Sequence, residues 1–147
     1  MPMLGLSADV WTILQRVGIA YLLTALIGWN REQEGHSAGI RTFPIVGMAS
    51  CGYILVLGMQ PDTTNQSRVL QGLITGIGFI GGGAILKEGS SVTGTATAAS
   101  IWNAGIIGAS VAMGRFEVAI VLSLLNLFTL RALLPLKSWL DRRKNRQ

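Results

Sequence analysis

Residues Gly76 to Trp102 read GIGFIGGGAILKEGSSVTGTATAASIW, and this stretch decides the fold class of the 147-residue chain. It holds seven glycines, and a single Lys-Glu pair supplies its only charges. The stretch is too apolar for a flexible linker and too rich in glycine for a helix in a soluble core. Small residues at this density let helix backbones approach closely inside a bilayer, where van der Waals contact holds helices together. The stretch therefore predicts an integral membrane protein.

The composition of the whole chain agrees with this prediction. Half of the residues are apolar, the mean hydropathy is +0.49 and 13% of the residues are charged, against about 25% in an average soluble domain. A membrane-crossing helix needs about 20 predominantly apolar residues. We expect such helices over residues 10–29, 43–59, 69–86, 95–113 and 116–136. The predicted fold is an all-α integral membrane protein, with a bundle of five transmembrane helices in one domain over residues 1–136 and a basic tail over 137–147.

The first of these runs is interrupted by Arg16. If the run is re-entrant and does not span, the bundle has four transmembrane helices. A charge inside a membrane span is a candidate functional residue by default. The alternative is that Arg16 extends toward the outer interface, where Glu117 or Asp62 lies nearby.

The positions of the cations predict the orientation of the chain, because Lys and Arg near span ends favour the cytoplasmic side. With five spans, Arg31, Arg41, Lys87 and the cations of the tail all fall on one side. We therefore expect an external N-terminus and a cytoplasmic C-terminus. The tail would bind anionic lipid headgroups, at about 1 kcal/mol per cation. The net charge of +5 thus requires no nucleic-acid partner.

Two polar connections lie on the predicted cytoplasmic face, NREQEGHSAGIRT after the first span and LKEGSSVTGT after the third. We expect Glu32 to pair with Arg41, and the N-terminus of the fourth span to face the same surface and favour carboxylates. The alternative is a solvated loop whose cations serve only orientation. His36 is expected at the surface, because no second His or Cys is near enough for a transition-metal site. The predicted inner-face functional cluster comprises Arg31, Glu32, Glu34, Arg41, Thr42, Lys87 and Thr97.

Four motifs carry a family resemblance in this order: two lie within REQEGHSAGIRT at 31–42, and GIGFIGGGAI at 76–85 and VTGTATAASIW at 92–102 follow. Over residues 16–116 the chain resembles the membrane domain of the MgtC/SapB family. The resemblance implies a bacterial inner-membrane protein linked to virulence and to growth at low magnesium. It also implies regulatory partners among membrane ATPases.

The chain departs from the family pattern at several positions. Gly82 replaces the usual Ala. Thr95 and Ala96 stand where the family has Leu followed by Thr or Asn, so one polar group before Thr97 is missing and its role is not carried over. Many relatives also carry an ACT-like domain after the last helix. The sequence resembles a short form without that domain, and functions that need it are not carried over.

Glycines in the third span repeat a small-xxx-small spacing, which lets neighbouring helices or a second subunit approach closely. The four positions are Gly72, Gly76, Gly78 and Gly82. We expect them to serve helix packing, and we expect a homo-oligomer, with a dimer favoured. Residues 76–81 also fit the dinucleotide fingerprint G-x-G-x-x-G, but that motif requires a preceding strand and an opening soluble helix. An apolar span runs through it here.

The fourth and fifth spans are expected to form an antiparallel hairpin around Gly114 and Arg115. Asn103 and Asn126 then lie opposite one another near mid-span. An unpaired amide is costly in hydrocarbon, so we expect the two side chains to meet and fix the register of the hairpin. The alternative is that each amide faces another helix or a second subunit.

The distribution of acidic residues bears on function, since Mg²⁺ requires octahedral oxygen coordination. All seven acids lie at span ends or outside the predicted spans. This favours a regulatory membrane protein over a carrier, with a direct transporter of Mg²⁺ or another ion as the alternative and a lipid-associated structural protein as the third reading. No catalytic residue set, metal site or cofactor is predicted.

Overall fold

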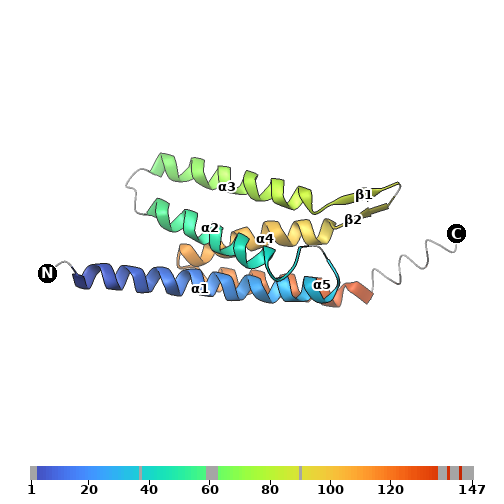
Figure 1. The fold of residues 1–147 in the computed structure, drawn as a ribbon, viewed down its shortest axis with the longest axis horizontal. Helices are drawn as coiled ribbons and strands as arrows, with labels where there is room; N and C mark the ends of the chain where they lie inside the picture. Colours follow the sequence, from blue (N-terminus) through green and yellow to red (C-terminus); the bar gives the residue numbers. More distant parts are fainter. Residues whose placement is uncertain are drawn as a thin grey trace.

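The computed structural model describes residues 3–36, 38–58, 63–89, 91–135, 139 and 143. These residues form five helices and one short hairpin of strands (Figure 1). The helices are α1 Met3–Gln33, α2 Thr42–Gly58, α3 Thr63–Gly83, α4 Thr95–Ala112 and α5 Phe116–Ala132. The number and order of helices expected from the sequence are confirmed. Their ends differ: α1 is longer than expected in both directions, α3 begins and ends earlier, and α5 ends before residue 133.

The connection between α3 and α4 is a β-hairpin, which the sequence analysis expected only as a polar loop. Strand β1 covers Leu86–Glu88 and pairs antiparallel with β2, Ser91–Thr93, so that Lys87 lies opposite Val92. Gly94 then joins the hairpin to α4 with φ 82°. A side chain at this position would clash with the Ala84 carbonyl. The hairpin therefore leads directly into the first turn of α4.

Consecutive helices run in opposite directions along the bundle (Figure 1). The last turns of α1 and α5, the first turns of α2 and α4, and the β-hairpin all lie at one end, which we call the hairpin end. The other end holds the N-terminus of α1 and the turn between α4 and α5, and we call it the turn end. The two polar connections thus share one end of the molecule, as the sequence analysis expected.

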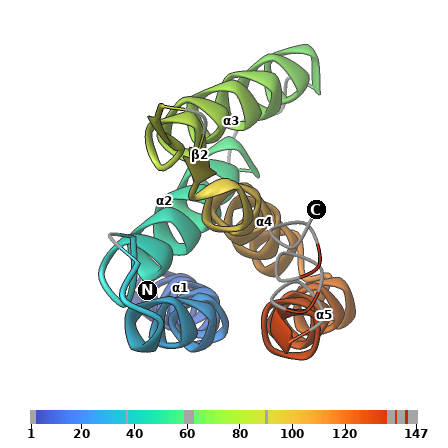
Figure 2. The same cartoon turned by 90° about the vertical axis from the view of Figure 1, so that its right-hand side faces the viewer.

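Helix α4 lies at the centre and packs against all four other helices (Figure 2). Eleven of its 18 residues are buried, against three of 17 in α5, so α4 is the core of the bundle. Its closest approach is to α2, where a side chain added at Gly108 would clash with the Gly47 carbonyl. The two backbones are therefore in contact at this crossing.

Four glycines of α3 were expected to serve helix packing, but within this chain they pack against no neighbouring helix. A methyl group added at Gly72, Gly76, Gly78 or Gly82 would meet no atom within 4 Å. The close approach of α3 is made by Gly81, where an added Cβ would lie 3.1 Å from the Ala98 carbonyl oxygen of α4. Contact of the four open glycines with a second subunit stays a prediction.

Helices α4 and α5 form the expected hairpin, but the predicted pairing of Asn103 with Asn126 is wrong. Asn103 Nδ2 donates to the Leu122 carbonyl, 3.3 Å away, and Ser100 Oγ donates to Asn126 Oδ1 at 2.9 Å. Each asparagine therefore takes its own partner on the facing helix, although both side chains line the same cavity between α4 and α5.

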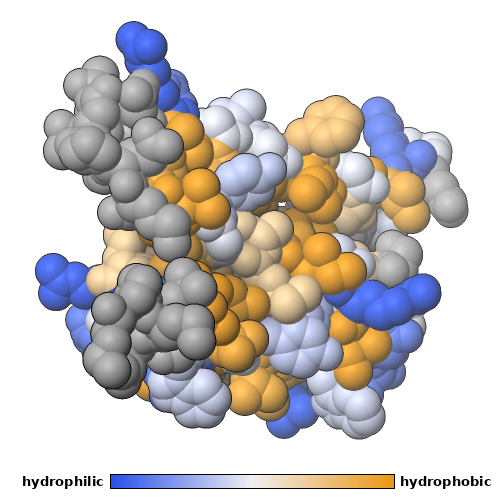
Figure 3. Space-filling model, turned by 60° about the vertical axis from the view of Figure 1, so that its left-hand side comes forward, coloured by the Kyte–Doolittle hydropathy of each residue, from blue (hydrophilic) through white to orange (hydrophobic). Residues whose placement is uncertain are grey.

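The outer surface of the bundle is rich in large apolar side chains. Phe79 is 85% exposed, and Trp11, Leu22 and Phe128 are each more than 60% exposed. Figure 3 shows apolar residues running across the face in view, with strongly hydrophilic ones mainly toward its margins. Among the described residues, Asp9–Gln33 is the one helical stretch both long and apolar enough to cross a membrane, and Thr42–Leu57 is a shorter apolar helix.

Candidate functional site

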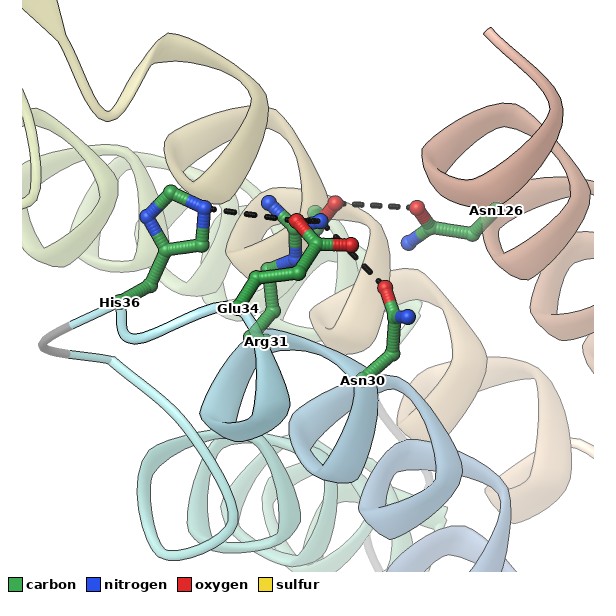
Figure 4. Close-up of polar contacts among 6 residues, drawn as sticks. Asn30, Arg31, Glu34, His36 and Asn126 are labelled. Carbon is green, nitrogen blue, oxygen red and sulfur yellow. Dashed lines mark hydrogen bonds and ion pairs between the residues drawn. The ribbon is translucent and has the colours of Figure 1, made fainter. Parts of the chain in front are cut away.

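The centre of the site is Arg31, in the last turn of α1 at the hairpin end. It is 3% exposed and is the one buried charged residue among those whose side chains are described. Its Nη2 forms an ion pair with Glu34 Oε2 and donates to Asn30 Oδ1, 3.3 Å away. His36 Nε2 lies 3.5 Å from the same Glu34 oxygen (Figure 4). We call Arg31, Glu34 and His36 the Arg31 cluster.

Local geometry explains why Glu34 joins this cluster and Glu32 does not. Residues three apart on a helix are neighbours, whereas adjacent residues point in different directions. Glu32 Oε2 instead accepts from the Ile40 backbone N–H at 3.1 Å, and a side chain at Gly39 would clash with this carboxylate. The expected pair of Glu32 with Arg41 is therefore wrong. Glu32 fixes the loop that leads into α2, and Arg41 is exposed.

A pocket of about 360 Å³ opens where the Arg31 cluster meets the first turn of α4 and the last turns of α5. The first N–H groups of a helix have no partner within the helix, and no side chain caps the start of α4. The positive end of the α4 dipole thus lies at this pocket. The pocket is lined by Arg31, Glu34, His36, Val92, Thr93, Gly94, Thr95, Ala96, Thr97, Thr129, Leu130, Leu133 and Leu134.

Among the described side chains, three buried polar atoms have no hydrogen-bond partner: Arg31 Nε, Thr97 Oγ1 and Asn126 Nδ2. Arg31 and Thr97 both line the pocket, and Thr97 is 2% exposed. Asn126 is not part of the pocket lining, and its Oδ1 accepts from Ser100, three residues after Thr97 on α4 (Figure 4). Buried polar groups are almost always paired. The pocket therefore offers unused hydrogen-bonding groups to a bound molecule or to water.

The structure brings together only part of the predicted inner-face functional cluster. Arg31, Glu34 and Thr97 meet at the pocket. Thr42 begins α2 and is half-buried, while Lys87 is exposed on β1; neither lines the pocket. His36, expected as a surface residue, does line it. Its position two residues after Glu34 was the available signal, but loop conformation decides whether the two side chains meet.

Arg16 lies in the half of α1 nearer the turn end and serves a different purpose. Its Nη1 donates to the carbonyl oxygen of Ala112, the last residue of α4, at 2.6 Å. A cation at a helix C-terminus satisfies a free carbonyl and interacts favourably with the helix dipole. Of the two alternative partners expected, Asp62 lies outside the described residues and no ion pair joins Arg16 to Glu117. Arg16 therefore links α1 to the end of α4.

The basic tail predicted over 137–147 lies largely outside the described residues. Within it, the guanidinium carbon of Arg143 lies 4.3 Å from the centre of the Trp139 ring. This is a cation–π contact. The predicted binding of lipid headgroups by the tail stays a prediction.

Comparison with known proteins identifies the family, because the MgtC family matches residues 17–139. The chain belongs to the MgtC family. This confirms the resemblance that the four motifs predicted. Ala96, where the sequence departs from the family pattern, lines the pocket beside Thr97.

Individual relatives are about one third identical to this chain. It is 33% identical over 123 residues to the putative magnesium transporter YhiD of Escherichia coli K12, covering 78% of this chain and 57% of the relative. Protein MgtC of Salmonella typhimurium LT2 is 35% identical over 108 residues, with 74% and 46% covered. Protein SrpB of Synechococcus elongatus is 33% identical over 129 residues, with 78% and 71% covered. The chain thus spans about half the length of several of these relatives. No solved structure matches.

Proposed function

We propose that this chain is a five-span protein of the bacterial inner membrane that regulates adaptation to low magnesium through membrane partners such as ATPases. Membership of the MgtC family and the magnesium transport in the name of the Escherichia coli relative support the link to magnesium. Extensive exposed apolar surface supports immersion of the bundle in lipid, since soluble monomers rarely expose large contiguous apolar patches. The cations at the hairpin end favour a cytoplasmic location for it.

The buried guanidinium of Arg31 is the observation that favours regulation over transport. Arg31 lies near one end of the bundle and Arg16 nearer the other, 15 residues apart on α1, or about 22 Å along a helix. A divalent cation moving between α1 and α4 would meet a positive charge toward each end, and like charges repel most strongly where water is excluded. Mg²⁺ also prefers carboxylate and water oxygens, and no carboxylate is buried among the described side chains. The space between α1 and α4 thus disfavours a magnesium route.

Direct transport of Mg²⁺ or another ion is the second candidate, because a relative at 33% identity is named as a putative magnesium transporter. The two candidates differ in what the isolated chain can do. A transporter moves the ion by itself, whereas a regulator requires its partner. A lipid-associated structural role is the third candidate and predicts neither ion flux nor an effect on a partner.

The test uses the full chain in two assays. In proteoliposomes that contain only this protein and an internal magnesium dye, we expect no Mg²⁺ entry above protein-free vesicles. In a bacterial strain that lacks its own MgtC-family protein, we expect the chain to restore growth at low magnesium. Saturable Mg²⁺ entry would overturn regulation in favour of transport. In that case Arg31→Gln should increase the flux, because it removes a buried positive charge.

A further inference from the structure

We propose that the pocket at the hairpin end binds the phosphate group of an anionic ligand. This goes beyond the proposed regulatory role, because it requires neither magnesium nor a regulated partner. Three features converge on the pocket: the buried Arg31 guanidinium, the buried Thr97 hydroxyl and the uncapped N-terminus of α4. Each supplies a hydrogen-bond donor or a positive electrostatic potential.

Two of the donors have no hydrogen-bond partner within the structure. Glu34 and Asn30 occupy Nη2 of Arg31, which leaves Nε without a partner. The Thr97 hydroxyl has no partner either. The first N–H groups of a helix are free to bind an anion, and the dipole favours negative charge there. A phosphate presents several acceptor oxygens, and its hydrogen bonds to a guanidinium are charge-assisted.

The wall of the pocket indicates two sources for the phosphate. The pocket is also lined by apolar side chains, among them Leu133 and Leu134, which follow α5 and are each about half exposed. This apolar rim suits the first carbons of a lipid chain next to a phosphate headgroup. Free phosphate presents the same acceptor oxygens as a lipid phosphate and would use the same donors. The experiment must therefore distinguish the two sources.

Glu34 is the group that opposes an anion in this pocket. Its carboxylate pairs with Arg31 and lies beside His36, and these three are the ionisable side chains that line the pocket. The ligand must compete with Glu34 for the guanidinium. Loss of Arg31 should therefore weaken binding and loss of the Glu34 charge should strengthen it. A purely structural ion pair predicts no such opposition, because the loss of either partner would be harmful.

The experiment uses the full chain in two arms. In an uncharged detergent, inorganic phosphate is titrated at constant ionic strength and binding is read from the thermal unfolding midpoint. The second arm uses nanodiscs that mix phosphatidylglycerol with a phosphate-free glycolipid. After the protein is released from the nanodisc, native mass spectrometry identifies which lipid stays bound to it. Because the basic tail would also retain an anionic lipid, the lipid source is identified by retention of phosphatidylglycerol that Arg31→Gln reduces. A phosphate-dependent midpoint without such retention identifies free phosphate.

Four variants give the expected pattern. Arg31→Gln should weaken binding about tenfold or more, as for a hydrogen bond to a charged group, and Thr97→Val roughly threefold, as for a neutral one. Glu34→Gln should tighten binding. Arg131→Gln is the matched control, because it removes an exposed cation of α5 at the same end that does not line the pocket, and it should leave binding unchanged.

Two results would overturn the proposal. The first is the absence of phosphate-dependent binding in both arms. The second is an equal loss in Arg31→Gln and Arg131→Gln, which would indicate diffuse charge. If Arg31→Gln does not fold, the phosphate affinities of Thr97→Val and Glu34→Gln test the proposal. A change of affinity in the same direction in both variants rejects the site. Failure here leaves the low-magnesium growth test unaffected, because neither arm measures growth or flux.

Discussion

Glycines in α3 and α4 follow similar small-residue spacings but have opposite surroundings. In α4, Gly105 and Gly108 face neighbouring helices so closely that an added methyl group would clash. In α3, added methyl groups at Gly72, Gly76, Gly78 and Gly82 would meet nothing within 4 Å. Small residues thus permit close approach, but the position of a helix in the bundle decides whether the approach happens.

The difference follows from where each helix lies. Helix α4 is surrounded by the four others, whereas α3 lies on the far side from α1 and α5 and packs against α2 and α4 (Figure 2). A cavity of about 540 Å³ separates α3 from α2, and Gly72 and Gly76 line it. The glycines of α4 are therefore part of the packed core, and those of α3 border space that another molecule can fill.

The largest expected effect is at Gly108. Gly108→Leu should abolish accumulation of folded protein, because the side chain would meet the Gly47 carbonyl and the Ser50 side chain of α2. Backbone atoms cannot move aside as a flexible side chain can, so even Gly108→Ala should cost about 1–3 kcal/mol or more, as for other overpacked sites. The measurement is the yield and unfolding midpoint of purified protein. Gly78→Leu is the control and should fold. If neither variant accumulates as folded protein, the distinction between the two helices is wrong.

A smaller effect is expected at Gly105, where α4 meets α3. An added methyl group would clash with Cδ1 of Ile77, the far end of a flexible side chain. Gly105→Ala should therefore cost about 1 kcal/mol, at the lower end for overpacking. Ile77→Val removes the clashing carbon, so the double variant should be more stable than the sum of the two single effects predicts. Strict additivity in unfolding measurements would mean that α3 and α4 do not meet at this point.

These contrasts show what the sequence can and cannot predict. The starts of α4 at Thr95 and α5 at Phe116 were predicted correctly, because glycine turns and apolar runs are local signals. The rotation of each helix about its axis is not local. Spacing indicated that Gly72 and Gly76 form one pair of small neighbours on α3 and that Gly78 and Gly82 form another. It did not indicate which side of the helix points to the bundle.

The candidate site shows the same division. Arg31, Glu34 and Thr97 were predicted as functional residues, and the structure places them at one pocket. Partner choice within the loop was not predictable, because Glu32 binds the Ile40 backbone N–H only in the folded loop conformation. Likewise, the hairpin of α4 and α5 was predictable from its turn, whereas the partners of Asn103 and Asn126 depend on side-chain packing along both helices.

The smallest expected effect is at Gly78, and it sharpens the comparison most directly. Alanine replaces glycine in an exposed helix with a gain of about 0.5–1 kcal/mol, because glycine loses more backbone entropy on folding. Since nothing lies within 4 Å of an added methyl group, Gly78→Ala should leave the unfolding midpoint unchanged or raise it slightly. Gly105→Ala should lower it in the same assay.

Gly78→Leu extends this test to the second subunit that the sequence analysis expected. If the open glycines of α3 face a second copy, the larger side chain should weaken cross-linking between copies while the single chain stays folded, because the space needed for a backbone contact is filled. Unchanged cross-linking would place any dimer contact elsewhere. A fall in single-chain stability as large as that of Gly105→Ala would contradict the open environment of α3 itself, and with it the contrast between the two helices.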